Sequence, residues 1–86
     1  MYSLSYSPRA QKAIRKFPKE YQKLILKKLE ILTETPKPRG FDKIASQDPP
    51  IYRIRVGDYR VFYFIDDLEK LVIVVDIVRR TTQTYR

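Results

Sequence analysis

Residues 51–65 read IYRIRVGDYRVFYFI, with large apolar side chains at every second position on both sides of Gly57-Asp58. Period-two alternation is typical of strands with one buried face, and Gly-Asp between two such runs predicts a tight hairpin turn. The buried face would hold Tyr52, Ile54, Val56, Tyr59, Val61, Tyr63 and Ile65. The opposite face would hold Arg53, Arg55, Arg60, Phe62 and Phe64.

Two amphipathic helices are expected before this hairpin. Residues 2–6 alternate large apolar side chains with serine, which predicts a short strand. Ser7 and Pro8 then predict a helix start, because a serine hydroxyl caps the first turn and proline fits the first helical position. This helix is expected to end near Phe17, and Pro18 opens a second one. The predicted apolar stripe of the second helix is Tyr21, Leu24, Ile25, Leu29 and Leu32.

The rest of the chain predicts a small sheet. Prolines within residues 35–40 end the second helix, and residues 41–50 are expected to form an irregular connection. Residues 71–78 are almost wholly apolar, which predicts a central strand. Asp76 interrupts this strand, and we expect it to pair with a neighbouring arginine. The predicted fold is α+β, in the order β-α-α-β-β-β, with the helical hairpin on one face of a mostly antiparallel sheet.

Composition bounds both the architecture and the chemistry. With 86 residues and 43% hydrophobic residues, the chain is expected to form a single domain, residues 1–86, around one core. It contains no Cys and no His, which excludes disulfides, thiolate zinc sites and Cys or His nucleophiles. We find no metal-ligand or cofactor-binding motif, so no cofactor is expected. The net charge of +8 favours a polyanionic or acidic protein partner.

The arginines of the polar sheet face allow two interpretations. They can form a solvated face that favours solubility and protects strand edges. They can also clamp phosphates, with Phe62 beside them to stack a base. The second interpretation is favoured because Arg79, Arg80, Tyr85 and Arg86 follow a strand that pairs near the hairpin. Such a concentration of arginines would repel itself without an anion.

Residues 52–63, YRIRVGDYRVFY, resemble the strand pair of RelE/ParE-superfamily toxins. The opening Tyr-Ser-Pro-Arg-Ala, the Lys/Pro-rich break, the closing apolar strand and the basic C-terminal tail are also similar to that family, so the resemblance covers nearly the whole chain. The hairpin motif is more specific than the helices. The short first helix is more similar to the RelE ribonuclease branch than to the ParE gyrase-inhibitor branch.

The resemblance implies a toxin of a type II toxin–antitoxin system that enters the ribosomal A site and cleaves mRNA without a metal. The 2′-hydroxyl would attack the adjacent phosphate, leaving a 2′,3′-cyclic phosphate and a 5′-hydroxyl. Arg60 matches the arginine that stabilises the phosphorane, and Arg79 the one that assists the leaving oxygen. Tyr85 matches a tyrosine that stacks on or orients a nucleotide. Residues implied to bind RNA are Arg53, Arg55, Arg80, Arg86 and Phe62, and the first two are also catalytic candidates.

The general base is left unassigned by this resemblance. Arg53 and Arg55 occupy positions where the ribonuclease branch often carries lysines, and an arginine stays protonated and is a poor proton acceptor. Val78 stands where many relatives carry His or Lys. Three other functions therefore stay open: a ParE-like gyrase inhibitor, a non-catalytic relative that binds an antitoxin or RNA, and an unrelated basic domain.

The expected partners are a cognate antitoxin and the ribosome with its mRNA. The antitoxin would carry an acidic to amphipathic segment that is partly disordered when free and orders on the basic surface. No stretch is long and apolar enough to predict a membrane span, and residues 1–6 lack the features of a signal peptide. A cytoplasmic protein is therefore expected.

Overall fold

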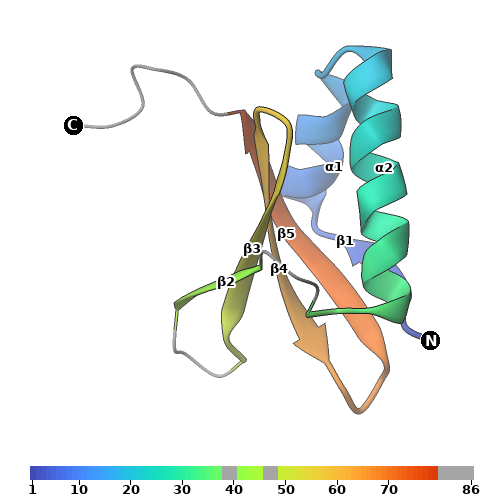
Figure 1. Cartoon of the computed structure of the whole chain (residues 1–86), viewed down its shortest axis with the longest axis vertical. Coiled ribbons are helices and arrows are strands. Elements are labelled where there is room, and N and C mark those ends of the chain that lie inside the picture. The colour runs from blue at the N-terminus through green and yellow to red at the C-terminus, as the bar shows by residue number, and fades with distance from the viewer. Residues whose placement is uncertain (38–40, 46–48, 80–86) are drawn as a thin grey trace.

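The computed structural model describes residues 1–37, 41–45 and 49–79, in which two helices pack on one face of a five-stranded sheet (Figure 1). The elements are β1 (Ser3–Tyr6), α1 (Pro8–Arg15), α2 (Lys19–Glu34), β2 (Asp42–Ala45), β3 (Ile51–Val56), β4 (Tyr59–Asp66) and β5 (Leu71–Arg79). The strand order is β1-β5-β4-β3-β2. β1 runs parallel to β5, and the other pairs are antiparallel. The predicted α+β class is confirmed.

The helical hairpin is fixed to the sheet at the start of α1. Ser7 caps this helix, since its side-chain oxygen accepts a hydrogen bond from the Ala10 amide at 3.1 Å. The same hydroxyl donates to the Val75 carbonyl in β5 at 2.5 Å. Pro8 occupies the first helical turn, as predicted. One serine therefore ends β1, starts α1 and holds the helix against β5.

α2 covers the middle of the sheet with one side only. Ile25, Leu29 and Leu32 are fully buried, which confirms most of the predicted apolar stripe. Leu24, which was also assigned to that stripe, is 52% exposed. The helical angle of 100° per residue explains the difference, because Leu24 lies to one side of the arc that the three buried residues share.

A short edge strand replaces part of the irregular connection that the sequence predicted for residues 41–50. β2 pairs antiparallel with β3, with Asp42 opposite Arg53. The Phe41 ring packs against Tyr52 with centroids 5.4 Å apart, which helps hold β2 to the sheet. Four strand residues are too few to show a period in sequence, and their partner lies further along the chain.

The hairpin of β3 and β4 carries the centre of the core. Tyr52, Ile54, Tyr59, Val61 and Tyr63 are buried against the helices, as predicted. Val56 lies opposite Tyr59, so the turn contains only Gly57 and Asp58. Gly57 has a φ of +60°, a backbone conformation that residues with a side chain rarely adopt, which is why glycine fits there.

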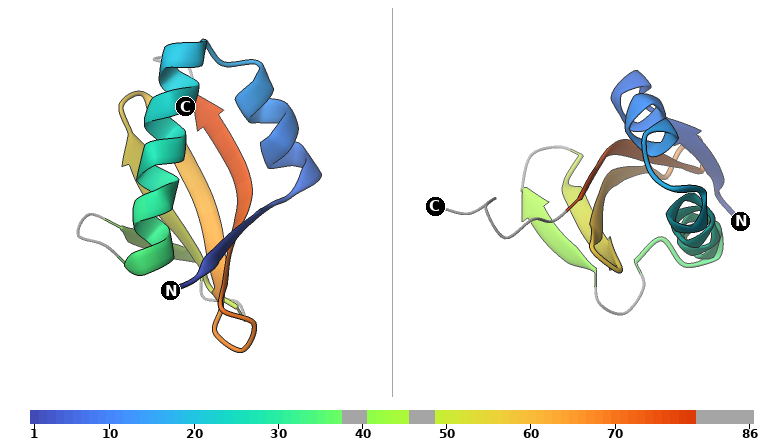
Figure 2. Two further views of the ribbon diagram at one scale, coloured as in Figure 1. Left: turned by 90° about the vertical axis from the view of Figure 1, so that its right-hand side faces the viewer. Right: turned by 90° about the horizontal axis from the view of Figure 1, so that it is seen from above.

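A β-bulge in β5 changes which side chains face the helices. Phe62 lies opposite Asp76, whereas the next residue, Tyr63, lies opposite Val74. Val72, Val74 and Ile77 are therefore the buried residues of β5, spaced by two and then by three. The extra residue moves Asp76 off the core face, where burial of its charge would be costly. Figure 2 shows the resulting twisted sheet, with both helices on one side and β2 far from α1.

Candidate nucleic-acid interface

The strand register sets the arginines of the open sheet face in rows across the strands. Arg55 lies opposite Arg60, and Arg60 lies opposite Val78. The next row runs through Asp42, Arg53, Phe62 and Asp76. Directly opposed residues share a face and lie about 5 Å apart at their Cβ atoms. No helix of the described part of the chain covers this face (Figure 1).

Arg53 is neutralised within the structure. Its Nη2 donates to Asp42 Oδ2 at 2.7 Å, which forms an ion pair between β3 and β2. The hydrogen bond from Arg53 lowers the pKa of the Asp42 carboxyl below its ordinary value, and the positive charges of Arg53 and Arg55 add to this effect. The Arg53 side chain is 23% exposed, and its Nε has no hydrogen-bond partner among the described residues. That nitrogen is itself buried, so the exposed part of Arg53 is the remainder of its side chain.

Arg55 and Arg60 form the most cationic row of the open face. They are direct cross-strand neighbours, and like charges in this position repel each other. Arg55 is exposed and Arg60 is half-buried, so the row presents one exposed and one partly covered guanidinium. An anion between them would relieve the repulsion, and two guanidinium forks match the oxygens of a phosphate group.

Aromatic rings flank this row. Phe62 and Phe64 of β4 are half-buried on the same face, and Phe62 lies directly between Arg53 and Asp76 in the register. Exposed ring area beside cations is suited to stacking a base whose phosphate binds the arginines. The predicted grouping of Arg53, Arg55, Arg60 and Phe62 on one face is therefore present.

Arg79 is not part of that grouping. It is the last residue of β5, it is exposed, and it lies opposite Tyr59, a core-facing residue. Simple alternation from Val72 and Val74 would place Arg79 on the open face, but the bulge reverses the faces beyond it. Arg79 thus ends the strand beside the Arg60 row, on the helix side. Arg80, Tyr85 and Arg86 lie outside the described residues.

Two acidic groups bound the arginine face, and only one of them could be anticipated. Asp76 Oδ2 lies 3.7 Å from Arg9 Nη1, and its Oδ1 accepts a hydrogen bond from the Ile77 amide at 2.8 Å. The predicted pairing of Asp76 with an arginine is confirmed, and its partner belongs to α1. Asp42 was missed because its pairing with Arg53 depends on the unpredicted strand β2.

The described residues contain no group of three or more His, Cys, Asp and Glu side chains that could hold a metal ion. Among the same residues, neither helix is long and apolar enough to cross a membrane.

Comparison with known proteins identifies the family. A family model described as the ParE toxin of type II toxin–antitoxin systems matches residues 4–84. The chain belongs to this family of toxins. Its resemblance to the RelE/ParE superfamily is thereby confirmed. No curated protein matches the toxin in sequence.

Solved structures of RelE proteins share the fold of this toxin. A chain of the archaeal RelE–RelB complex from Pyrococcus horikoshii OT3 is 27% identical with a TM-score of 0.82, over 94% of this chain and 97% of that one. An E. coli RelE mutant in complex with a peptide of the antitoxin RelB is 28% identical with a TM-score of 0.77, over 94% and 85%. Isolated E. coli RelE, at 24% identity and a TM-score of 0.84 over 98% and 89%, shows the same fold.

Proposed function

We propose that this toxin is a ribosome-dependent mRNA endonuclease that inhibits translation and needs no metal. The observation that carries the proposal is the Arg55–Arg60 row on the uncovered sheet face, with Phe62 in the next row and Phe64 in the row after it. A row of guanidinium groups next to aromatic rings fits a nucleotide whose phosphate and base are both held. The similarity to the RelE fold supports the same assignment.

In the proposed reaction the 2′-hydroxyl oxygen of an mRNA nucleotide attacks the adjacent phosphorus. A P–O bond forms as the 2′-hydroxyl gives its proton to water. The bond to the 5′-oxygen of the next nucleotide breaks, and that oxygen takes a proton from water to become a 5′-hydroxyl. The other product is a 2′,3′-cyclic phosphate. Arg60 stabilises the negative charge that grows on the phosphorane, and Arg55 and Arg53 hold the phosphate backbone. Arg79 starts from the helix side of the sheet, so its side chain must reach around the end of β5 to assist the leaving oxygen. Tyr85, Arg80 and Arg86 contact neighbouring nucleotides.

Alignment on the ribosome supplies much of the rate in this proposal. The arginines stay protonated and do not accept the 2′-hydroxyl proton. Asp42 is a weak base, because its bond with Arg53 lowers its pKa. Holding the 2′-oxygen in line with the phosphorus is itself worth several kcal/mol. In this proposal, an active site built from cations works best on an mRNA strand that the ribosome has already bent and fixed.

The proposed protein partner is a cognate antitoxin, as in the RelE complexes with RelB. A net charge of +8 favours an antitoxin with an acidic to amphipathic segment that orders on the toxin. We expect a neighbouring gene to encode this short protein, with a DNA-binding end that represses the operon. The toxin itself would act in the cytoplasm, where its ribosomes are.

A second candidate function is inhibition of DNA gyrase. It is favoured by one observation, the match of a ParE family model to nearly the whole chain. Such an inhibitor would bind gyrase and would need no cleavage chemistry. Plasmid supercoiling by purified gyrase, measured with and without the toxin, tests this function directly.

Induced expression with primer extension on an abundant mRNA tests the nuclease. We expect discrete cuts that follow the reading frame, and a loss of about 10²- to 10³-fold in cleavage for Arg60→Ala. The control is Lys27→Ala, which removes an exposed cation of α2 on the far side of the sheet. Growth arrest without cuts would overturn the proposal and favour gyrase. Cuts that persist in the Arg60→Ala variant would overturn the catalytic role of Arg60.

A further inference from the structure

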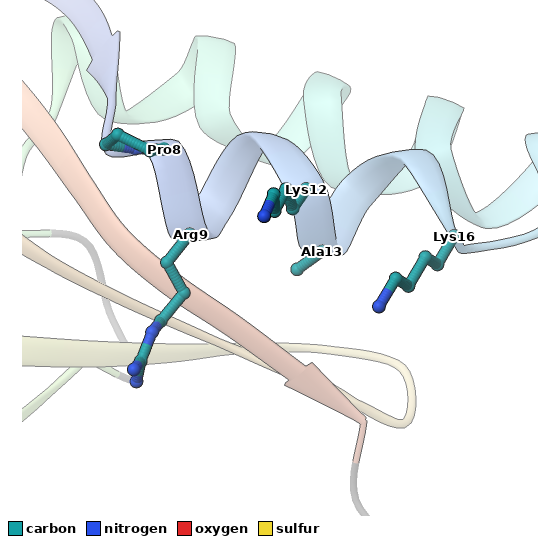
Figure 3. Close-up of a pocket in the computed structure, with 5 residues that line it drawn as sticks. All are labelled: Pro8, Arg9, Lys12, Ala13 and Lys16. Atoms are coloured by element: carbon teal, nitrogen blue, oxygen red, sulfur yellow. The ribbon is translucent and has the colours of Figure 1, made fainter.

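A second cationic surface lies on α1 and meets the edge of the open sheet face at Asp76. An open groove of about 450 Å³ is lined by Pro8, Arg9, Lys12, Ala13 and Lys16, which we call the α1 groove. Figure 3 shows Arg9, Lys12 and Lys16 projecting from one side of the helix, with Arg9 reaching over β5. The proposed nuclease chemistry uses none of these residues.

The three cations form a ladder along the helix. Their spacing of three and then four residues keeps them on one face. At a rise of 1.5 Å per residue, the ladder is about 10 Å long. A stacked nucleic-acid strand carries one phosphate per about 3.4 Å of axis, so this length spans about three phosphates.

Little negative charge opposes this ladder. The chain contains no Asp or Glu before Glu20. Neither Lys12 nor Lys16 lies within ion-pair distance of a carboxylate among the described residues. Asp76 is the acid that reaches the groove, and it contacts Arg9 at 3.7 Å while leaving the Arg9 side chain 78% exposed. The ion pair therefore holds Arg9 in place without covering it.

Stabilisation of the helix does not account for all three cations. Lys12 lies in the last turn of α1, where a positive charge interacts well with the helix dipole. Arg9 lies in the first turn, where the dipole disfavours a cation. The outer face of α2 gives a useful contrast, because it carries Glu20 and Glu30 as well as its lysines. The α1 groove has no such balance.

The lining also indicates the class of ligand. Pro8 and Ala13 are small and bring a ligand close to the helix backbone, and the groove has no large apolar side chain. A peptide that docks as an amphipathic helix needs apolar pockets for its anchors, whereas a phosphate backbone needs only well-placed cations. The groove also follows β5 toward the end that carries Arg79 (Figure 3).

We propose that the α1 groove binds the phosphate backbone of an RNA strand, independently of sequence. Arg9, Lys12 and Lys16 each contact a phosphate, and Asp76 fixes the position of Arg9. This site goes beyond the proposed nuclease function. It contains no catalytic group, and it binds RNA whether or not Arg60 supports cleavage.

Fluorescence anisotropy with the full chain tests the groove. The probe is a fluorescein-labelled 2′-O-methyl oligouridine of about 12 nucleotides, which lacks the attacking hydroxyl and fits a short single-strand site. The groove variant is Lys12→Ala/Lys16→Ala, and the matched control is Lys23→Ala/Lys27→Ala on α2, which removes the same charge. Affinity is measured between about 50 and 200 mM salt, and thermal melts verify that each variant is folded.

We expect the groove variant to bind at least about tenfold more weakly and its salt slope to fall by about 1.4, since two phosphate contacts are lost. Lys12→Arg/Lys16→Arg should restore binding. In the Arg60→Ala background, removal of the two groove lysines should weaken binding of the RNA probe by the same factor as in the parent. Equal weakening in the groove variant and the α2 control would overturn the proposal, because net charge alone would then explain binding. Unchanged binding in the groove variant would also overturn it. The proposal would also be overturned if the groove variant bound polyglutamate more weakly than the parent but bound the RNA probe equally well. The ligand of the groove would then be an acidic protein.

Discussion

At the scale of single residues, ion pairs and hydrogen bonds set which side chains of the open face are available. Arg53 is tied to Asp42 across the β2–β3 pair, while Arg55 and Arg60 face each other in the next row. The face therefore has Arg53 in an ion pair and, in the adjacent row, two opposed guanidinium groups. In the proposed function the Arg55–Arg60 row binds the phosphate and Arg53 has a positioning part.

The Asp42–Arg53 pair makes stability depend on pH. The hydrogen bond from Arg53 lowers the pKa of Asp42 in the folded state. The stability that the Asp42–Arg53 pair adds to the folded state is therefore fully present above the unfolded-state pKa of about 3.9. It is lost as pH falls through the lower folded-state pKa. We expect Asp42→Asn to melt below the parent at neutral pH, and the two melting curves to converge in acid. Glu20→Gln controls for the loss of one charge. A difference between parent and Asp42→Asn that stays constant down to strongly acidic pH would contradict this account.

Tyr63 illustrates a buried hydroxyl that serves structure and not chemistry. Its hydroxyl donates to the Pro36 carbonyl at 2.7 Å, and burial raises its pKa well above the ordinary value. Tyr63→Phe should cost about 1–2 kcal/mol, because the carbonyl loses its donor, and should lower the melting temperature by several degrees. Tyr59→Phe is the control, since the Tyr59 hydroxyl makes no hydrogen bond within the described part of the chain. Equal melting temperatures for the two variants would show that the Pro36 contact contributes nothing.

At the scale of elements, the start of α1 joins three parts of the fold. Ser7 caps the helix and also bonds the Val75 carbonyl beside the β5 bulge. Beyond Val74 the edge of β5 has no β1 residue to pair with, and the Ile77 amide is satisfied by Asp76 instead. The Ser7 and Asp76 side chains thus replace strand pairing where β1 ends.

Loss of the Ser7 hydroxyl should therefore loosen α1 as a unit. We expect Ser7→Ala to destabilise the fold by about 1–2 kcal/mol, since both a helix cap and a bond to β5 are removed. Hydrogen exchange should show faster exchange of the α1 amides than of the β3–β4 hairpin. Ser3→Ala, at an exposed position of β1, is the matched control. Uniform acceleration across the sheet would mean that α1 does not open separately.

The elements also show how far the sequence alone can predict this fold. Alternation along residues 51–65 places every core and polar side chain of the hairpin correctly, because local period and burial agree there. The Ser7-Pro8 start of α1 is also local information. β2 and the β5 bulge depend on partners distant in sequence, so Asp42 and the face of Arg79 could not be predicted from period. The grouping of the hairpin arginines was predictable, whereas the neutralisation of Arg53 was not.

At the scale of the whole molecule, cations occupy two surfaces, the open sheet face and the α1 groove, which adjoin at Asp76. An antitoxin can neutralise the toxin by covering either surface or both. Arg60 is central to the proposed cleavage, yet it is one residue of a large basic surface. An antitoxin that binds over that whole surface should tolerate its loss, because binding energy is spread over many contacts.

Competition in cells tests this separation of toxicity from antitoxin binding. A strain carries the toxin with just enough of its neighbouring-gene partner to grow, and Arg60→Ala toxin is then induced. We expect growth to stop, because the inactive variant binds the antitoxin and releases active toxin by mass action. Induction of Arg60→Ala in a strain without the active toxin is the control and should leave growth unchanged. Continued growth in the first strain, with the variant shown to be folded and abundant, would mean that Arg60 is a principal antitoxin contact and that neutralisation acts directly at the proposed active site.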